Sequence, residues 1–398
     1  MLAAACMLGC QRSSSSLSSQ RPAQAPQDPR LPTARRVDPE VPALVPAARC
    51  GECHGPLENE WRESAHAKAD TSPLYRRMRA ASGSQDCDSC HAPLRRFARQ
   101  DPAAEEGVTC DACHMLRIDK AAAGVSFSLH PEDNVRYGPL CDSQPHYFHR
   151  MGCSPLHRES EFCAACHDGN RHLPGSTGAS RSLFPEYEEW RSEYSAQGSH
   201  DCQVCHMPAS RREAAVGSHE RPEIRHHGFR LHGRLLGQAL QGQAHVRRDA
   251  QALTVDVQLR NDGAGHAVPS GLPERRLQVG VELLDERGRV VAQVEHSRGR
   301  FLVDERGHEA PFYAAVRDVK DSRIRPGQTE HSVFTLPLRP ASQLRIFVRR
   351  RPLSWTIAQQ LGVTAPADEP MLQATLPLAQ LGTAARHGAV AISVRLQP

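Results

Sequence analysis

One five-residue pattern recurs through the first half of the sequence: two cysteines separated by two residues, with a histidine directly after the second. It occurs five times and therefore uses ten of the 14 cysteines in the chain. The cysteines of the pattern are Cys50, Cys53, Cys87, Cys90, Cys110, Cys113, Cys163, Cys166, Cys202 and Cys205, and its histidines are His54, His91, His114, His167 and His206. Thiols form covalent bonds or ligate soft metals, and imidazole is the commonest metal ligand in proteins.

The pattern C-x-x-C-H is the attachment signature of c-type haem. The two thiols add to the vinyl groups of one porphyrin, and the histidine that follows binds the iron as an axial ligand. Structural zinc sites and thioredoxin-like redox sites also use C-x-x-C. Neither needs a histidine after each second cysteine, and a thioredoxin-like protein carries one such motif rather than five. The sequence therefore predicts five covalently bound haem c groups.

The segment that carries the pattern is short for five cofactors. It runs from Cys50 to His206, which is 157 residues, or about 31 for each haem. Apolar residues make up 39% of the chain and aromatic residues 5%, which is low for a globular protein. We therefore expect residues 49–234 to form a domain of short helices and irregular loops packed on the haems.

The rest of the chain has a different period. Apolar and polar residues alternate from Leu253 to Leu259 and again from Leu277 to Leu283, as in strands with one buried face. Further short apolar runs are separated by turn signals such as Asp285 to Gly288. This spacing predicts an all-β, immunoglobulin-like sandwich over residues 235–398, with a short helix from Ser354 to Leu361. The protein is thus expected to be multidomain.

Composition and motifs exclude several functions. The formal net charge is only +4 at pH 7, which is too balanced for a nucleic-acid binder. The sequence shows no serine-triad motif, nucleotide-binding loop or paired-carboxylate signature. What remains is chemistry carried by the haems themselves.

The first residues predict export. Residues 1–10 are apolar and end in Leu8-Gly9-Cys10, which resembles a bacterial lipobox, with Cys6 as a poorer alternative and an ordinary cleaved signal peptide as another. Residues 11–48 are rich in serine and proline and are predicted to be a disordered tether. Because haem c is attached outside the cytoplasm, we expect a periplasmic or cell-surface protein, anchored to a membrane by lipid on Cys10.

Further segments resemble multihaem c-type cytochromes related to the tetrahaem cytochrome that serves hydroxylamine oxidoreductase. The segments that carry the resemblance are Trp61-Arg-Glu-Ser-Ala-His66, Tyr137-Gly-Pro139, Pro145-His146, Pro155-Leu-His157-Arg-Glu-Ser160, Glu188-Glu-Trp190 with Tyr194, and Gly263-Ala-Gly-His266-Ala-Val-Pro-Ser-Gly271. In the last one, Ser270 stands where the G-H-x-x-P-T-G pattern of the family has threonine.

This resemblance implies a second axial ligand for each iron. The implied ligands are His66, His146, His157, His227 and His266. His226 and His232 stay alternatives to His227, and the spare histidines that could replace an implied ligand are His130, His149, His172 and His200. For His266, we expect the loop Asn261 to Gly271 to reach back to a haem, with Gly263 and Gly265 letting the backbone approach the porphyrin.

Two cysteines outside the pattern flank His146. Cys141 and Cys153 would close a short loop if they formed a disulfide in an oxidising compartment, and this would fix the position of that histidine. Two independent thiols remain the other interpretation.

These features predict an exported cytochrome that transfers electrons through five haems, most of them held by two histidines, with redox proteins as partners. Two alternatives stay open. One is a multihaem oxidoreductase in which an open haem acts on a small nitrogen or sulfur compound. The other is a structural subunit of an electron-transfer complex or a cytochrome filament. We expect a carrier more than a catalyst, because haem chains are tuned by axial ligands and burial rather than by acid and base groups.

Overall fold

A computed structural model describes most of the chain after residue 43. The described residues are 44–84, 87–97, 101–121, 124–129, 134–143, 148–168, 182–195, 200–229, 234–381 and 390–398. The predicted leader with Cys10 and most of the predicted tether lie outside them. Leu44 is already buried, so ordered structure begins before residue 49. Pro42–Pro398 form one compact unit, and the predicted domain boundaries stay predictions.

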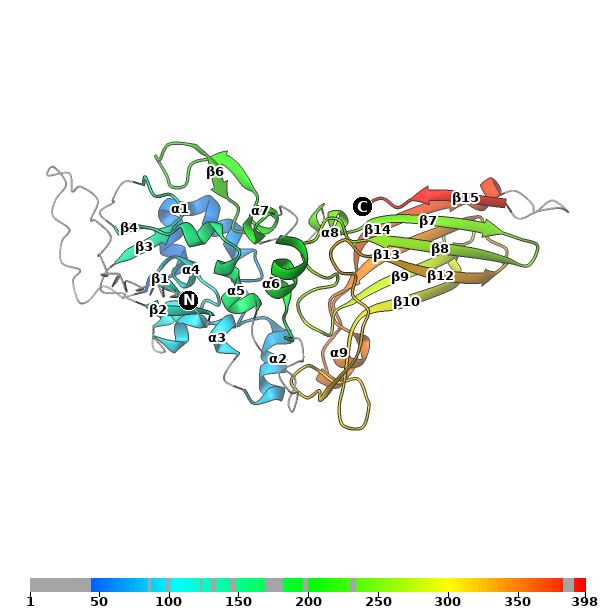
Figure 1. Cartoon of the computed structure of the whole chain (residues 1–398), viewed down its shortest axis with the longest axis horizontal. Coiled ribbons are helices and arrows are strands. Elements are labelled where there is room, and N and C mark those ends of the chain that lie inside the picture. The colour runs from blue at the N-terminus through cyan, green and yellow to red at the C-terminus, as the bar shows by residue number, and fades with distance from the viewer. Residues whose placement is uncertain are drawn as a thin grey trace, which may run out of the picture. The chain divides into compact units, whose positions relative to one another are not determined.

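The first part of this unit is built from short helices and loops, as expected (Figure 1). The α-helices are α1 (Ala47–Arg62), α2 (Pro73–Ser82), α3 (Asp88–His91), α4 (Cys110–His114), α5 (Glu161–His167), α6 (Glu186–Glu189), α7 (Cys202–His206) and α8 (Arg234–Ala239). The other helical turns are η1 (Pro93–Arg96), η2 (Pro102–Glu105), η4 (Pro155–Arg158) and η5 (Trp190–Tyr194). Among the described residues no helix is long and apolar enough to cross a membrane.

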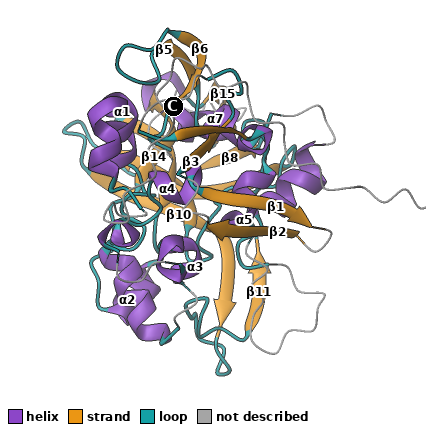
Figure 2. Cartoon of the chain, turned by 90° about the vertical axis from the view of Figure 1, so that its left-hand side faces the viewer, coloured by secondary structure: helices purple, strands orange, loops and turns teal. Residues whose placement is uncertain are grey.

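Three two-stranded ribbons join these helices (Figure 2). Their strands are β1 (Leu116–Ala121) with β2 (Gly124–Leu129), β3 (Val135–Gly138) with β4 (Arg150–Cys153), and β5 (Ala209–Arg212) with β6 (Arg221–Arg225). The pair β3–β4 is parallel, whereas the other two are antiparallel. Parallel neighbours need a long connection, and the one between β3 and β4 carries His146 and His149.

The second part is a large β-sheet region, which confirms the strand prediction in outline. Its strands are β7 (Gln241–Arg248), β8 (Ala252–Arg260), β9 (Arg276–Leu284), β10 (Val290–Val303), β11 (Arg317–Asp321), β12 (Thr329–Pro337), β13 (Gln343–Arg351), β14 (Glu369–Pro377) and β15 (Val390–Arg395). They form a five-stranded sheet, β11-β10-β9-β13-β14, and a four-stranded sheet, β12-β8-β7-β15. The predicted helix is present as α9 (Trp355–Leu361), capped by the Ser354 side chain, and a last turn is η7 (Leu378–Leu381).

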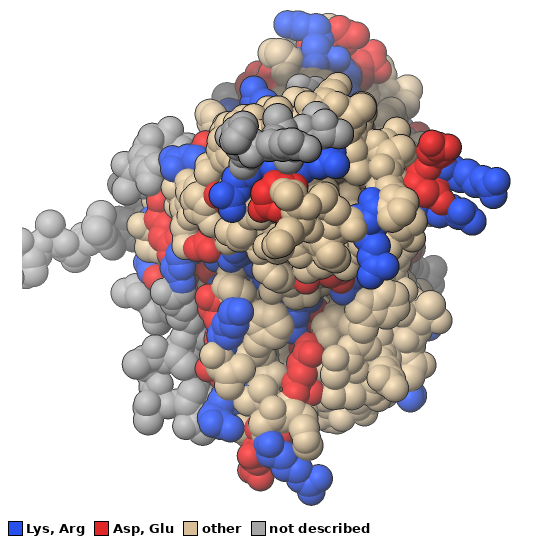
Figure 3. Space-filling view, turned by 90° about the vertical axis from the view of Figure 1, so that its right-hand side faces the viewer, with Lys and Arg blue, Asp and Glu red and all other residues tan. Residues whose placement is uncertain are grey.

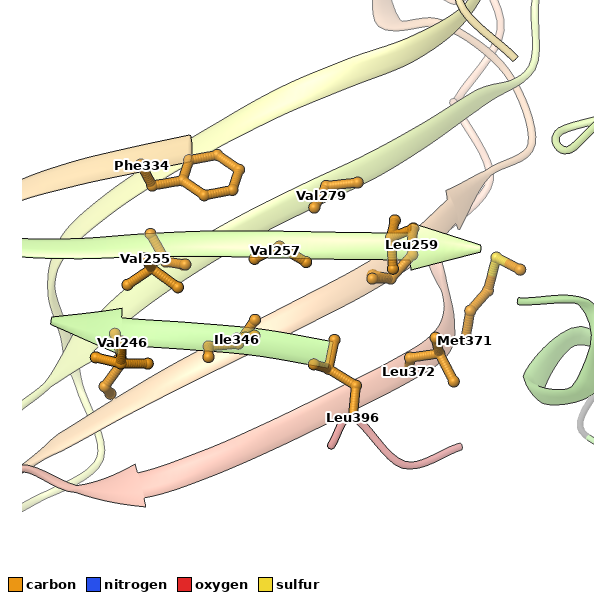
Figure 4. Packing of buried hydrophobic residues seen from close by; sticks show 14 of the residues in the cluster. Val246, Val255, Val257, Leu259, Val279, Phe334, Ile346, Met371, Leu372 and Leu396 are labelled. Carbon is orange, nitrogen blue, oxygen red and sulfur yellow. The ribbon is translucent and has the colours of Figure 1, made fainter. Parts of the chain in front are cut away.

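The two sheets share one apolar core. In β8 the buried positions alternate with half-buried ones, as the period of two requires. Val255, Val257 and Leu259 of β8 pack in one cluster with Val279 and Ile346 of the five-stranded sheet (Figure 4). We call this two-sheet region the sandwich; its immunoglobulin-like type stays a prediction. On the face shown in Figure 3, acidic and basic side chains are interspersed among neutral ones.

Candidate haem sites

Each C-x-x-C-H pattern lies on a helix, which is long for the first pattern and short for the other four. Helices α3, α4, α5 and α7 end at the histidine of the pattern. In α1 the helix is kinked at His54, where φ is −105° and ψ is 38°. Cysteines three residues apart lie on one face of a helix. Each helix can therefore present two thiols and one imidazole to the same group, as haem attachment requires.

Backbone carbonyls fix the orientation of three of these imidazoles. The Nδ1 atoms of His54, His91 and His114 lie 2.7, 2.9 and 2.7 Å from the carbonyl oxygens of three residues far along the chain. Those residues are Ala214, Ala69 and Tyr137, in the same order. An Nδ1–H that donates to a carbonyl leaves Nε2 free to bind a metal ion.

Four of the five attachment histidines face a second histidine. The distances between ring centroids are 6.4 Å for His54–His149, 6.3 Å for His167–His66, 6.1 Å for His114–His227 and 6.2 Å for His206–His266. Two imidazoles on opposite sides of one metal ion hold their centroids roughly 6 Å apart, because each metal–nitrogen bond is about 2.0 Å long. The residues present therefore fit haem iron with two histidine ligands at four sites.

Burial also favours the ligating form of these histidines. It lowers the pKa of His66, His206 and His227 to about 4 in each case, with smaller effects from neighbouring histidines. Such imidazoles are neutral at pH 7, and the neutral ring is the form that binds a metal.

His227, and not its neighbour His226, faces His114. The Nδ1 atom of His227 lies 2.9 Å from the Arg225 carbonyl, and its backbone N–H donates to Glu60. His226 instead pairs with Glu60 through its own side chain, at 2.8 Å. That His227 rather than His226 is the ligand stays a prediction, and the ring distance to His114 is the observation that supports it.

The other two implied ligands are placed differently. His157 lies 5.5 Å from His114, but its Nε2 is 3.0 Å from the Cys113 carbonyl oxygen. His114 thus has two histidine neighbours, of which only one can share its iron. His146 lies outside the described residues, as do the spare histidines His130, His172 and His232. The spare His149 is the one that faces His54.

The site of His91 has a neighbour that the sequence did not indicate. Tyr75 of α2 stacks on the His91 ring at 4.2 Å with an angle of 18° between the planes, and its hydroxyl donates to Asp88. Burial and this hydrogen bond raise the pKa of Tyr75 well above its ordinary value. The tyrosine is therefore a neutral packing partner of the attachment histidine.

The segment Trp61 to His66 has a clear local basis. The Trp61 indole N–H donates to the Val108 carbonyl at 2.8 Å, and the Val108 N–H donates back to the His66 carbonyl at 3.0 Å. Gly107 has φ of +70°, and a Cβ atom there would lie 2.6 Å from the His66 carbonyl oxygen. Only glycine fits this close approach, which holds His66 next to the third attachment pattern.

The loop that carries His266 is held from both sides. Within the sandwich, the Asn261 side chain donates to the carbonyls of His266 and Ile324, each at 2.9 Å. The two glycines of the loop are needed for contacts with protein: a Cβ on Gly263 would strike the Gln238 carbonyl, and one on Gly265 would press on Tyr194 and Trp190. These contacts give a reason for the two glycines other than the expected approach to the porphyrin.

Three glutamates of the segment 186–193 bind the sandwich. Glu189 accepts from the Ala267 N–H at 3.0 Å and pairs with Arg323 at 2.8 Å, and both side chains are almost fully buried. Glu186 accepts from the Gly271 N–H, and Glu193 pairs with Arg325. The spacing of three and four residues places all three on one helical face. This spacing is visible in the sequence, although the partners are not.

The thiols of different patterns lie next to one another. A nearby thiol raises the pKa of one cysteine in each of three pairs, namely Cys110 beside Cys50, Cys166 beside Cys90, and Cys163 beside Cys202. Attachment sites one and three, two and four, and four and five are therefore neighbours. Outside the patterns, Cys141 and Cys153 form the disulfide that the sequence left open.

Comparison with known proteins gives one family match and one similar fold. Residues 49–115, which hold the first three patterns and His66, match the family described as cytochrome c554 and c-prime. The fold is similar to a penta-heme cytochrome c552 from Thermochromatium tepidum, with a TM-score of 0.68 and 21% identity over 84% of this chain and 99% of that chain. A beta-glucosidase 3B from Thermotoga neapolitana also matches, with a TM-score of 0.17 and 15% identity over 40% of this chain and 17% of that chain. No curated protein matches the sequence.

The attachment patterns, the family match and the fold together support one class of protein, a multihaem c-type cytochrome. The closer relation to the tetrahaem cytochrome that serves hydroxylamine oxidoreductase stays a prediction. The relation of the motif around His266 to that family also stays a prediction.

Proposed function

We propose that this protein is an exported cytochrome that transfers electrons through five covalently bound haem c groups, most of them held by two histidines. The observation that carries the proposal is the set of four histidine pairs with centroids 6.1 to 6.4 Å apart, each containing one attachment histidine. A second histidine closes the iron to other ligands, which suits electron transfer rather than binding of a substrate.

The protein chain would bind and orient the haems, and the haems would carry out the redox chemistry. Haem c, when bound, provides an iron that alternates between the ferrous and ferric states. The ten pattern cysteines would hold the porphyrins, and each pattern histidine would supply one ligand to an iron. His66, His149, His227 and His266 would supply the second ligand at four sites. The proximity of thiols from different patterns groups the sites into two sets, the first with the third, and the fourth with the second and the fifth.

The test is a spectroscopic one on the protein matured with haem. Mass spectrometry should give five haems per chain, and the electron paramagnetic resonance spectrum of the oxidised protein should contain only low-spin iron. Carbon monoxide should leave the spectrum of the reduced protein unchanged. A high-spin iron or uptake of carbon monoxide would count against a pure carrier and would favour the oxidoreductase alternative.

Location and partners follow from the chemistry of attachment. We expect the protein in the periplasm or at the cell surface, held by lipid on Cys10, with redox proteins as its partners. What supports this is the lipobox-like sequence and the site of haem attachment outside the cytoplasm. A labelled fatty acid should be incorporated into the protein in cells, and this label should be lost in Cys10→Ser. Loss of the label in Cys6→Ser instead would show that Cys6 carries the lipid.

A further inference from the structure

The first attachment site has a neighbour that the resemblance did not indicate. The His149 ring lies 6.4 Å from the His54 ring, with 27° between their planes. The Nδ1 atom of His54 is bound to the Ala214 carbonyl on one side. Nε2, the atom that the hydrogen bond leaves for a metal, is available to an iron between the two rings.

A short parallel ribbon fixes the backbone on both sides of His149. The Asn134 side chain donates to the Phe148 carbonyl at 2.9 Å, and the Arg150 N–H donates to the Asn134 carbonyl at 2.9 Å. The residue before His149 and the residue after it are thus bound to the same asparagine. His149 therefore directly precedes β4, with its backbone neighbours on both sides held by hydrogen bonds.

A disulfide closes the end of this ribbon. Strand β3 pairs with β4 from Val135 opposite Arg150 to Gly138 opposite Cys153. Cys153 is the last residue of β4, and its bond to Cys141 joins the end of β4 to the segment that directly follows β3, across a sequence separation of 12. Cross-links of this kind restrict the conformations of the segment between them. Asp142 in the same loop pairs with Arg221 of β6, at 2.9 Å.

We propose that His149 is the second axial ligand of the haem attached at Cys50 and Cys53, and that the ribbon closed by the Cys141–Cys153 disulfide holds it there. This rests on the proposed function, since it assigns a ligand to one of the proposed haems. The resemblance implied His146, three residues earlier in the same disulfide loop, as a ligand without assigning it to a particular haem, and counted His149 only among the spare histidines. The Tyr137 carbonyl of β3 also binds His114 of the third pattern. One ribbon therefore supports two neighbouring sites.

The first experiment compares His149→Ala with the matched variant His146→Ala. Each is matured with haem, checked by mass for five haems, reduced and titrated with carbon monoxide. We expect His149→Ala to bind one more carbon monoxide per chain than the parent protein and to gain one high-spin iron when oxidised. His146→Ala should match the parent in both measurements.

The outcomes separate the two histidines. If His149→Ala binds no additional carbon monoxide, His149 is not a ligand and the proposal is wrong. If both variants bind one more, the double variant decides: two more per chain support the proposal, whereas one more means a shared site and overturns it. A parent protein with fewer than five haems would count against the proposed function, while binding relative to that parent still decides the role of His149.

A second variant tests the same assignment if His149→Ala does not mature with five haems. Methionine also ligates haem iron and raises its reduction potential relative to histidine. In His149→Met, a redox titration should show one potential raised and all irons low-spin. Potentials that all equal those of the parent would contradict the assignment.

The ribbon is tested by removing both cysteines. The variant Cys141→Ser with Cys153→Ser should open the same haem, so that it binds added carbon monoxide and the further change His149→Ala adds none. If the serine variant binds no more than the parent, the disulfide does not hold the ligand and that part of the proposal fails.

Discussion

The two regions of this chain reach their folds by different means. The sandwich buries a continuous cluster that draws on both sheets, including Val257, Phe334 and Ile346, and burial of such side chains is the main source of stability in ordinary domains. The largest apolar cluster described in the helical region is small: Leu44, Leu94, Ala103, Ala104, Ala112 and Met115. In the helical region, hydrogen bonds to backbone carbonyls orient the side chains of several histidines. One region is therefore specified by apolar burial, and the other by sites for a cofactor.

The largest effect should come from withholding haem. A chain made without the attachment machinery should lose the fold of its first part, because the imidazole pairs have no iron to join them, while the sandwich stays folded on its own core. Limited proteolysis with mass spectrometry should then give a protected fragment that begins near Arg234. Equal protection of residues 44–229 without haem would remove the contrast between the two regions.

A smaller effect should follow from damage to the sandwich core. Phe334 is 1% exposed, and Phe334→Ala should lower the free energy of unfolding of the sandwich by about 3–5 kcal/mol, because it removes a large ring and leaves a cavity. Calorimetry of the mature protein measures this. The matched variant is Val333→Ala on the same strand, where the side chain is 56% exposed and the change should be within about 0.5 kcal/mol. Equal losses in the two variants would show that the core is not where the structure places it.

The smallest effect should be at the contact between the regions. Glu189→Gln removes a buried charge that faces Arg323 and weakens the hydrogen bond from Ala267, the residue after His266. We expect a loss of roughly 2 kcal/mol in stability, as for a charged hydrogen bond, and faster binding of carbon monoxide at one haem. The control is Glu188→Gln, whose side chain is 51% exposed. If the rate of carbon monoxide binding is the same in both variants, the glutamate does not position His266.

The features that could be predicted from the sequence are those whose signal is local. The attachment pattern fits within five residues, and the strand around Val255 shows its period of two within nine. Ser354 likewise precedes its helix directly, as a capping residue must. In each case the residues that carry the signal are the residues that form the structure.

The features that could not be predicted depend on pairs far apart in the chain. His149 lies next to His54 because β3 pairs with β4, and this pairing of distant residues leaves no local signal around His149 in the sequence. The glutamates at 186, 189 and 193 have helical spacing, but an exposed acidic face would look the same. Their role depends on Arg323 and Arg325, more than a hundred residues later.

The hydrogen bond between His54 and Ala214 has a consequence for assembly. The two residues are separated by 160 positions, and the neighbouring bond from the Val216 N–H to the Cys53 carbonyl spans a similar stretch. For the exported protein that we propose, the first attachment pattern would cross the membrane well before residues 209–225, the hairpin that includes Ala214. We therefore expect the first site to reach the attachment machinery early and to gain the hydrogen bond that orients its imidazole only after the fifth pattern has crossed.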